Sequence, residues 1–140
     1  MSKLSLAAVV TVGLVVLNAA SAFALPSFKK AFEARYVKPL NNEEFTKAAK
    51  KAGCNVCHVK GEEKETRNAY GDSLAELIEG DAADRVKKAE ETNGESGKDE
   101  ENAKLLEELE KAFNAAESKA SPAGPTFGEL LKSGKLPIGP

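Results

Sequence analysis

Both cysteines of the chain and its one histidine fall within five consecutive residues, Cys54-Asn55-Val56-Cys57-His58. A disulfide between two cysteines so close together would close a loop of only four residues and would add little stability. The fold therefore cannot depend on a disulfide bridge between distant parts of the chain. The cluster instead places two thiols and one imidazole in a single short segment.

The pattern Cys-x-x-Cys-His is the attachment motif of c-type haem. Each thiol can add to one haem vinyl group, and the adjacent His58 can present a ring nitrogen to the iron as the proximal ligand. Three other interpretations remain open. A disulfide leaves the histidine without a role, a thioredoxin-like dithiol needs a strand–helix context that is not evident, and two cysteines with one histidine fall short of a closed zinc site.

The first 24 residues have the features of a secretory signal peptide. Lys3 supplies a positive start, 4–17 is apolar, and Ala22-Phe23-Ala24 fits the small-x-small cleavage rule. The alternative is an uncleaved membrane anchor, but the apolar run is shorter than a full span. We therefore expect a signal peptide at 1–24, one domain at 25–140, and a periplasmic or otherwise exported protein that is not integral to the membrane after cleavage.

The charge balance argues against nucleic acid and anionic membrane surfaces as partners. The chain has 20 basic and 22 acidic residues, a formal net charge of −2, whereas surfaces for such partners are strongly basic. The charged stretch 90–110 is interpreted as the solvated face of a helix, with a docking patch for a basic partner as the alternative. No glycine-rich phosphate loop is present, and no small-molecule substrate is indicated.

Apolar residues recur at helical spacing between Gly, Pro and Asn residues, and this pattern predicts an all-α fold. We expect Ser27 to cap a first helix and Pro39 to end it. Asn41 is predicted to cap the helix that leads into the motif. Gly71 is predicted to begin the helix that follows the motif.

In the second half of the chain, Asp81 is predicted to cap a helix that ends in a loop over 92–98. A longer helix is expected over 99–119, with one apolar stripe facing the core. Thr126 and Glu129 have the spacing of a capping box and predict a short final helix.

The signal peptide, the helix before the motif, the motif itself and the small helical remainder together resemble a monohaem c-type cytochrome of the bacterial periplasm. The resemblance implies a small cytochrome c-like helical domain around one covalently bound haem c, with Cys54 and Cys57 as attachment points and His58 as the iron ligand. A weaker likeness is the element Asn68-Ala69-Tyr70-Gly71, since some bacterial proteins with this motif carry a similar element at this distance. It suggests a structural or haem-pocket role for Asn68 and Tyr70.

The chain departs from that family at the second axial ligand of the iron. Its only methionine is Met1, which leaves with the signal peptide, and its only histidine already belongs to the motif. Three states remain open for the sixth position. It is free or water-bound, it takes a weak internal ligand such as a lysine, the N-terminal amine or the Tyr70 phenolate, or it takes a ligand from a partner.

Two expectations concern the surroundings of the motif. His58 is expected to donate its other ring N–H to a backbone carbonyl or to water, as ligating histidines usually do. Lys60, Lys64 and Arg67 are the nearest candidates to pair with haem propionates, and the favoured alternative is that all three face solvent.

The resemblance implies one-electron transfer between redox protein partners rather than an enzyme activity. A gas- or peroxide-binding haem protein with an open distal site is one alternative. A non-catalytic assembly module with a structural haem is another. Peroxidase chemistry would need a distal acid–base group, and no second histidine exists to supply it.

Overall fold

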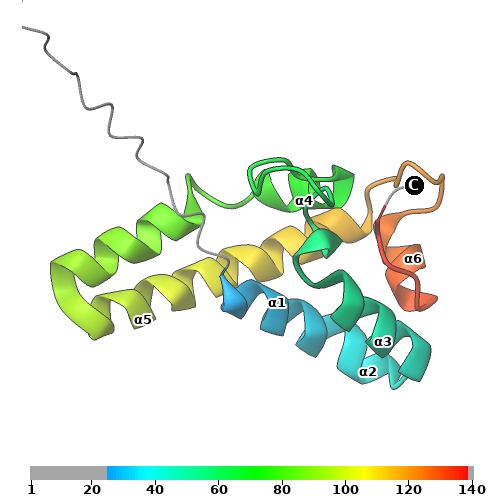
Figure 1. The fold of residues 1–140 in the computed structure, drawn as a ribbon, viewed down its shortest axis with the longest axis horizontal. Coiled ribbons are helices and arrows are strands. Elements are labelled where there is room, and N and C mark those ends of the chain that lie inside the picture. Colours follow the sequence, from blue (N-terminus) through cyan, green and yellow to red (C-terminus); the bar gives the residue numbers. More distant parts are fainter. Residues whose placement is uncertain (1–24, 139–140) are drawn as a thin grey trace, which may run out of the picture.

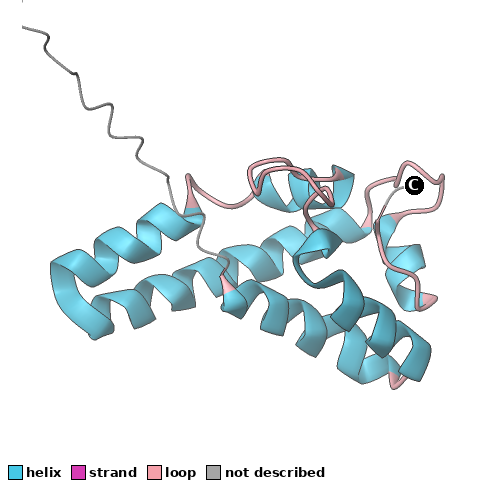
Figure 2. Ribbon diagram, viewed as in Figure 1, coloured by secondary structure: helices cyan, strands magenta, loops and turns pink. Residues whose placement is uncertain are grey.

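The computed structural model describes residues 25–138, which form helices joined by loops (Figures 1 and 2). No strand occurs in this range, so the predicted all-α class is confirmed, and none of these helices is long and apolar enough to cross a membrane. The predicted signal peptide, 1–24, lies outside the described residues. The helical elements, in order, are α1 (Pro26–Phe32), the π-helical turn η1 (Glu33–Val37), α2 (Lys38–Leu40), α3 (Glu43–Ala52), the 3₁₀ turn η2 (Gly53–Val56), α4 (Ala69–Ala75), α5 (Ala82–Glu117) and α6 (Phe127–Lys132).

The first helix continues past the residue that was predicted to end it. Pro39 lies inside α2, and the turn before it is widened, since the Lys38 N–H donates to the Glu33 carbonyl five residues earlier. A proline ring crowds the carbonyl four residues earlier in a regular α-helix and supplies no N–H. The wider π turn accommodates it. The prediction that Ser27 caps this helix was also wrong, because Pro26 already occupies its first turn.

The N-cap of α3 is one residue later than predicted. The Asn42 side chain accepts the Phe45 N–H at 3.0 Å. Asn41 is in the left-handed region, with φ of 47°, and ends α2. Asparagine tolerates that conformation better than most residues, so the two neighbours have different roles. At the other helices, the caps predicted at Asp81 and at Thr126 with Glu129 are confirmed.

The long element α5 is a hairpin of two helical arms, which Figure 1 shows turning back on itself. Only Gly94 has a non-helical backbone inside it, with φ of 65° and ψ of −153°. The loop predicted over 92–98 is therefore wrong, because one glycine in a left-handed conformation reverses the chain. Gly97 lets the arms approach, since a Cβ there would lie 2.4 Å from the Ala89 carbonyl oxygen.

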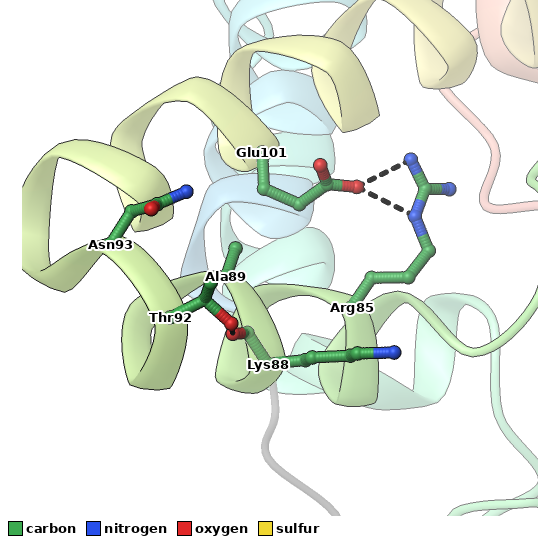
Figure 3. A pocket seen from close by; sticks show the side chains of 6 residues that line it. All are labelled: Arg85, Lys88, Ala89, Thr92, Asn93 and Glu101. Carbon is green, nitrogen blue, oxygen red and sulfur yellow. Dashed lines mark hydrogen bonds and ion pairs between the residues drawn. The ribbon is translucent and has the colours of Figure 1, made fainter.

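Arg85 joins the two arms through carboxylates of the second arm. Its guanidinium donates to Glu101 at 2.7 Å and to both oxygens of Glu108 at 2.9 Å, and to the Glu79 carbonyl at 2.7 Å. Figure 3 shows Arg85 reaching across to Glu101 beside a shallow hollow of about 300 Å³ between the arms. The hydrogen bond from Arg85 lowers the pKa of Glu108.

The core lies where α1, α4 and α6 pack against the second arm of α5. Aromatic side chains dominate it, with ring centroids 5.2 Å apart for Phe32 and Tyr36 and 5.2 Å apart for Tyr70 and Phe127. The predicted stripe of the second arm faces inward as expected. Its buried residues are Leu105, Leu109, Ala112, Phe113 and Ala116.

A second arginine ties η1 to the end of α5. Arg35 donates to Glu117 at 2.8 Å, and the neighbouring Tyr36 hydroxyl donates to the same carboxylate at 3.0 Å. Burial of Glu117 acts to raise its pKa, but the hydrogen bonds from Arg35 and Tyr36 outweigh burial and leave the pKa lowered. This cluster anchors the N-terminal helices to the second arm.

Gly97→Ala should destabilise the protein by about 1–3 kcal/mol, because the new methyl group would meet backbone of the first arm rather than a movable side chain. Urea unfolding followed by far-UV circular dichroism measures this difference. Ser96→Ala is the control, since Ser96 is exposed next to Gly97, and its effect should stay within about 0.5 kcal/mol. Equal stability of Gly97→Ala and the parent would show that the arms do not pack this closely.

Stability should also fall as the pH drops below about 4.5, the ordinary carboxyl value. The pKa values of Glu108 and Glu117 are lowered in the folded state, so the unfolded chain binds more protons in this window. Their contribution is complete above the unfolded pKa and is lost as the pH falls through the folded pKa. Urea unfolding between pH 3 and 7 should show a shallower acid loss for Glu108→Gln than for the parent. An unchanged slope would contradict the pairing with Arg85.

Candidate functional site

The Cys-x-x-Cys-His motif forms one tight turn at the end of α3. Gly53, with φ of 54° and ψ of −121°, ends the helix and begins η2. The Cys57 and His58 N–H groups both donate to the Cys54 carbonyl, at 3.2 and 3.1 Å. A helix therefore delivers the motif as a compact turn, as the sequence predicts.

The two cysteines are free thiols in different environments. Cys54 is exposed, whereas Cys57 is partly buried and packs against the core. Burial raises the pKa of the Cys57 thiol to about 12, Cys54 adds to the rise, and the charge of Arg67 partly offsets it. Cys57 therefore stays protonated at neutral pH, and Cys54 is the more exposed of the two residues.

His58 lies partly buried next to Cys57, at the start of a loop that doubles back. Its backbone pairs with Arg67 in a short antiparallel bridge, and the Val59 N–H donates to the Thr66 carbonyl at 3.0 Å. The Nδ1 atom of His58 is buried and has no hydrogen-bond partner among the described residues. The acceptor expected for this ring nitrogen is not found there.

Asn68 connects the motif to α4 through its backbone and its side chain. Its N–H donates to the Cys57 carbonyl at 3.0 Å, and its Nδ2 donates to the Val56 carbonyl at 2.9 Å. Its Oδ1 accepts the Gly71 N–H at 2.9 Å and so caps α4. Helix α4 thus begins earlier than predicted, at Ala69, because Asn68 rather than Gly71 marks its start.

Gly71 brings α4 into direct contact with the motif. A Cβ at this position would lie 2.0 Å from the Cys57 carbonyl oxygen, closer than any side chain allows. Glycine in the first turn of a short helix costs helical stability, and that cost was the available sequence signal for a close approach. Sequence reasoning gave Asn68 and Tyr70 a structural or haem-pocket role here, and it gave Gly71 only the start of the helix. We call Asn68–Gly71 the clamp.

Tyr70 is fully buried between the motif and the core. Its ring packs against Phe127 and lies 6.3 Å from Phe32, centroid to centroid. Its hydroxyl lies within electrostatic reach of Tyr36 but makes no hydrogen bond of normal geometry. Burial, followed by the influence of Tyr36 and Cys57, raises its pKa far above the ordinary value. In this conformation Tyr70 is a neutral phenol.

The cations near the motif lie at the surface. Lys60, Lys64 and Arg67 are all exposed, on the loop between η2 and α4. The two valines of this segment differ in burial, since Val56 is buried in the core whereas Val59 is 37 % exposed. The loop therefore presents charge to solvent while the turn beneath it packs inward.

Within residues 25–138, no three His, Cys, Asp or Glu side chains converge in a way that could hold a metal ion by themselves. Two hollows of this range lie elsewhere, one between the arms of α5 and one of about 350 Å³ beside Arg35 and Lys132. The motif offers an exposed thiol, a partly buried thiol and an imidazole nitrogen without a protein partner.

Comparison with known proteins gives no further assignment for this site. No family model, no curated protein and no solved structure matches the chain.

Gly71→Ala should destabilise the protein by about 1–3 kcal/mol, because the added methyl group would overlap the Cys57 carbonyl oxygen, which belongs to backbone. Chemical unfolding monitored by circular dichroism measures the loss. Asp72→Ala, at the exposed next position of α4, is the control and should cost less than about 1 kcal/mol. Full stability of Gly71→Ala would mean that α4 does not rest on the motif.

Proposed function

We propose that this protein is an exported haem c protein that transfers single electrons between redox protein partners. One haem is attached through thioether bonds to Cys54 and Cys57, and His58 binds the iron on the proximal side. The observation that carries the proposal is the motif turn itself. It places two free thiols and an imidazole in a single turn.

The residues of the turn fit this cofactor in their chemistry. Both thiols are unbridged and therefore available for addition to vinyl groups. A bound haem would supply an iron that alternates between two oxidation states. The protein's part is to hold the imidazole, and it does so by fixing the backbone of the turn through Asn68.

Exposure of Cys54 supports electron transfer as the role. A haem joined to an exposed residue has one edge near the protein surface, where a redox partner can approach.

The distal position favours one second candidate, a gas- or peroxide-binding haem protein. Residues 25–140 contain no methionine and no histidine other than His58. The Tyr70 phenolate is a poor internal ligand in this conformation, because burial opposes its deprotonation. We therefore propose a distal position that is open or water-bound, with a lysine, the N-terminal amine or a partner residue as the remaining alternatives.

Expression of the full chain with a c-type maturation system should give protein that carries one haem covalently. A pyridine haemochrome spectrum and the intact mass measure the attachment, and Cys54→Ser with Cys57→Ser together should abolish it. Protein that stays haem-free, in a host that matures a control cytochrome, would overturn the proposal.

Electron paramagnetic resonance of the loaded ferric protein should show a high-spin iron, because no strong sixth ligand is available. Carbon monoxide binding to the ferrous form should then be rapid. A low-spin spectrum typical of amine ligation would contradict the open distal site while leaving the attachment unaffected.

A further inference from the structure

We propose that the clamp closes the Cys57 half of the motif in the haem-free chain, so that the two thiols react in a fixed order. Cys54 is attached while the clamp is closed, and Cys57 only after α4 has moved away from the motif. Asn68 is the positioning residue that holds the closed form. This inference rests on the proposed haem attachment. It adds the order in which the two cysteines react and the role of the clamp in delaying Cys57.

The two thiols differ in access because Cys57 is partly buried whereas Cys54, at the start of the turn, is exposed. Cys57 packs against the core, and its carbonyl oxygen lies against Gly71 while accepting the Asn68 N–H. Movement of Cys57 toward a bulky planar ligand therefore requires α4 to separate from the turn.

Asn68 provides the hydrogen bonds that hold the clamp against the motif, whereas Tyr70 packs the clamp against the core. Asn68 bonds the Cys57 and Val56 carbonyls and caps α4. Helix α4 has only seven residues, and the loop before it is exposed over 59–67. Short elements with exposed flanks open locally at a lower free energy than the whole protein unfolds. Opening of the clamp must also withdraw Tyr70 from its contact with Phe127, so Cys57 is reached only rarely in the folded parent.

Two buried polar atoms, one in His58 and one in Tyr70 of the clamp itself, favour opening. The Nδ1 atom of His58 and the hydroxyl of Tyr70 have no hydrogen-bond partner in the closed form. A buried polar group without a partner is costly, and it regains hydrogen bonds when water reaches it. The hydrogen bonds of Asn68 therefore stabilise the closed form, whereas the unpaired polar atoms of His58 and Tyr70 destabilise it.

The attachment chemistry is the same at both cysteines. The thiol S–H adds across a vinyl C=C, a C–S bond forms, and the thiol hydrogen ends on the other vinyl carbon. Electrons balance without an external oxidant or reductant. The two thiols differ in access, and this difference should appear with any small thiol reagent.

The first experiment uses the folded, reduced, haem-free full chain and iodoacetamide, with peptide mass spectrometry to follow each cysteine. Cys54 should be alkylated at least about tenfold faster than Cys57, because local opening limits only Cys57. Asn68→Ala should raise the Cys57 rate about tenfold, since the bonds to the turn are lost, and leave the Cys54 rate within about twofold. Equal rates in the parent would overturn the proposal.

Asn42→Ala is the matched control, because it removes the same kind of helix cap without any bond to the motif carbonyls. It should leave the ratio of the two rates unchanged. If Asn68→Ala fails to fold, Asn68→Asp keeps the cap oxygen but loses the Nδ2 donor, and it should still speed Cys57. An unchanged Cys57 rate in a folded Asn68 variant would overturn the role of Asn68.

The second experiment supplies ferrous haem to the reduced chain, either folded or unfolded in urea. The folded parent should accumulate a product with one thioether bond at Cys54, whereas Asn68→Ala and the unfolded chain should proceed to two. A folded parent that attaches first at Cys57 would overturn the order. Absence of any covalent haem would count against the proposed function, whereas the alkylation rates test the clamp separately.

Discussion

The carbonyl oxygen of Cys57 is the point on which the arrangement around the motif depends. It accepts the Asn68 N–H, and it lies so close to Gly71 that no side chain fits between them. This contact sets how closely α4 packs on the motif turn. With α4 in that place, Tyr70 enters the core and the loop 59–67 must double back over His58.

The rest of the molecule is a platform for this contact. The second arm of α5 supplies the surface against which α1, α4 and α6 pack. Two arginines secure that arm, Arg85 to the first arm and Arg35 to η1, each through carboxylates on it. Because these pairs are partly shielded from water and linked to other hydrogen bonds, they specify the geometry more than isolated surface ion pairs would. The motif turn therefore rests on a frame that is held by helix packing and by these two arginines.

Local signals predicted part of this fold well. Asp81 and Thr126 act within their own helix turns, so a few neighbouring residues suffice to identify them. The helix end predicted at Pro39 and the loop predicted over 92–98 were wrong for a common reason. A π turn absorbs the proline, and Gly94 alone reverses the chain between two arms that stabilise each other by packing. Propensity favours an end or a loop at such places, but tertiary contacts outweigh it.

The sequence by itself determined which reactive side chains the motif carries. It placed both thiols and the imidazole in one turn, and it left residues 25–140 without a methionine or a second histidine. Only the tertiary structure decided that Cys54 is exposed and Cys57 partly buried. It also decided that Asn68 and Gly71 contact the backbone of the turn. Reactive groups are identified by residue type and spacing, which are local. Access and burial depend on which distant segments come to lie against them, and no local pattern records that.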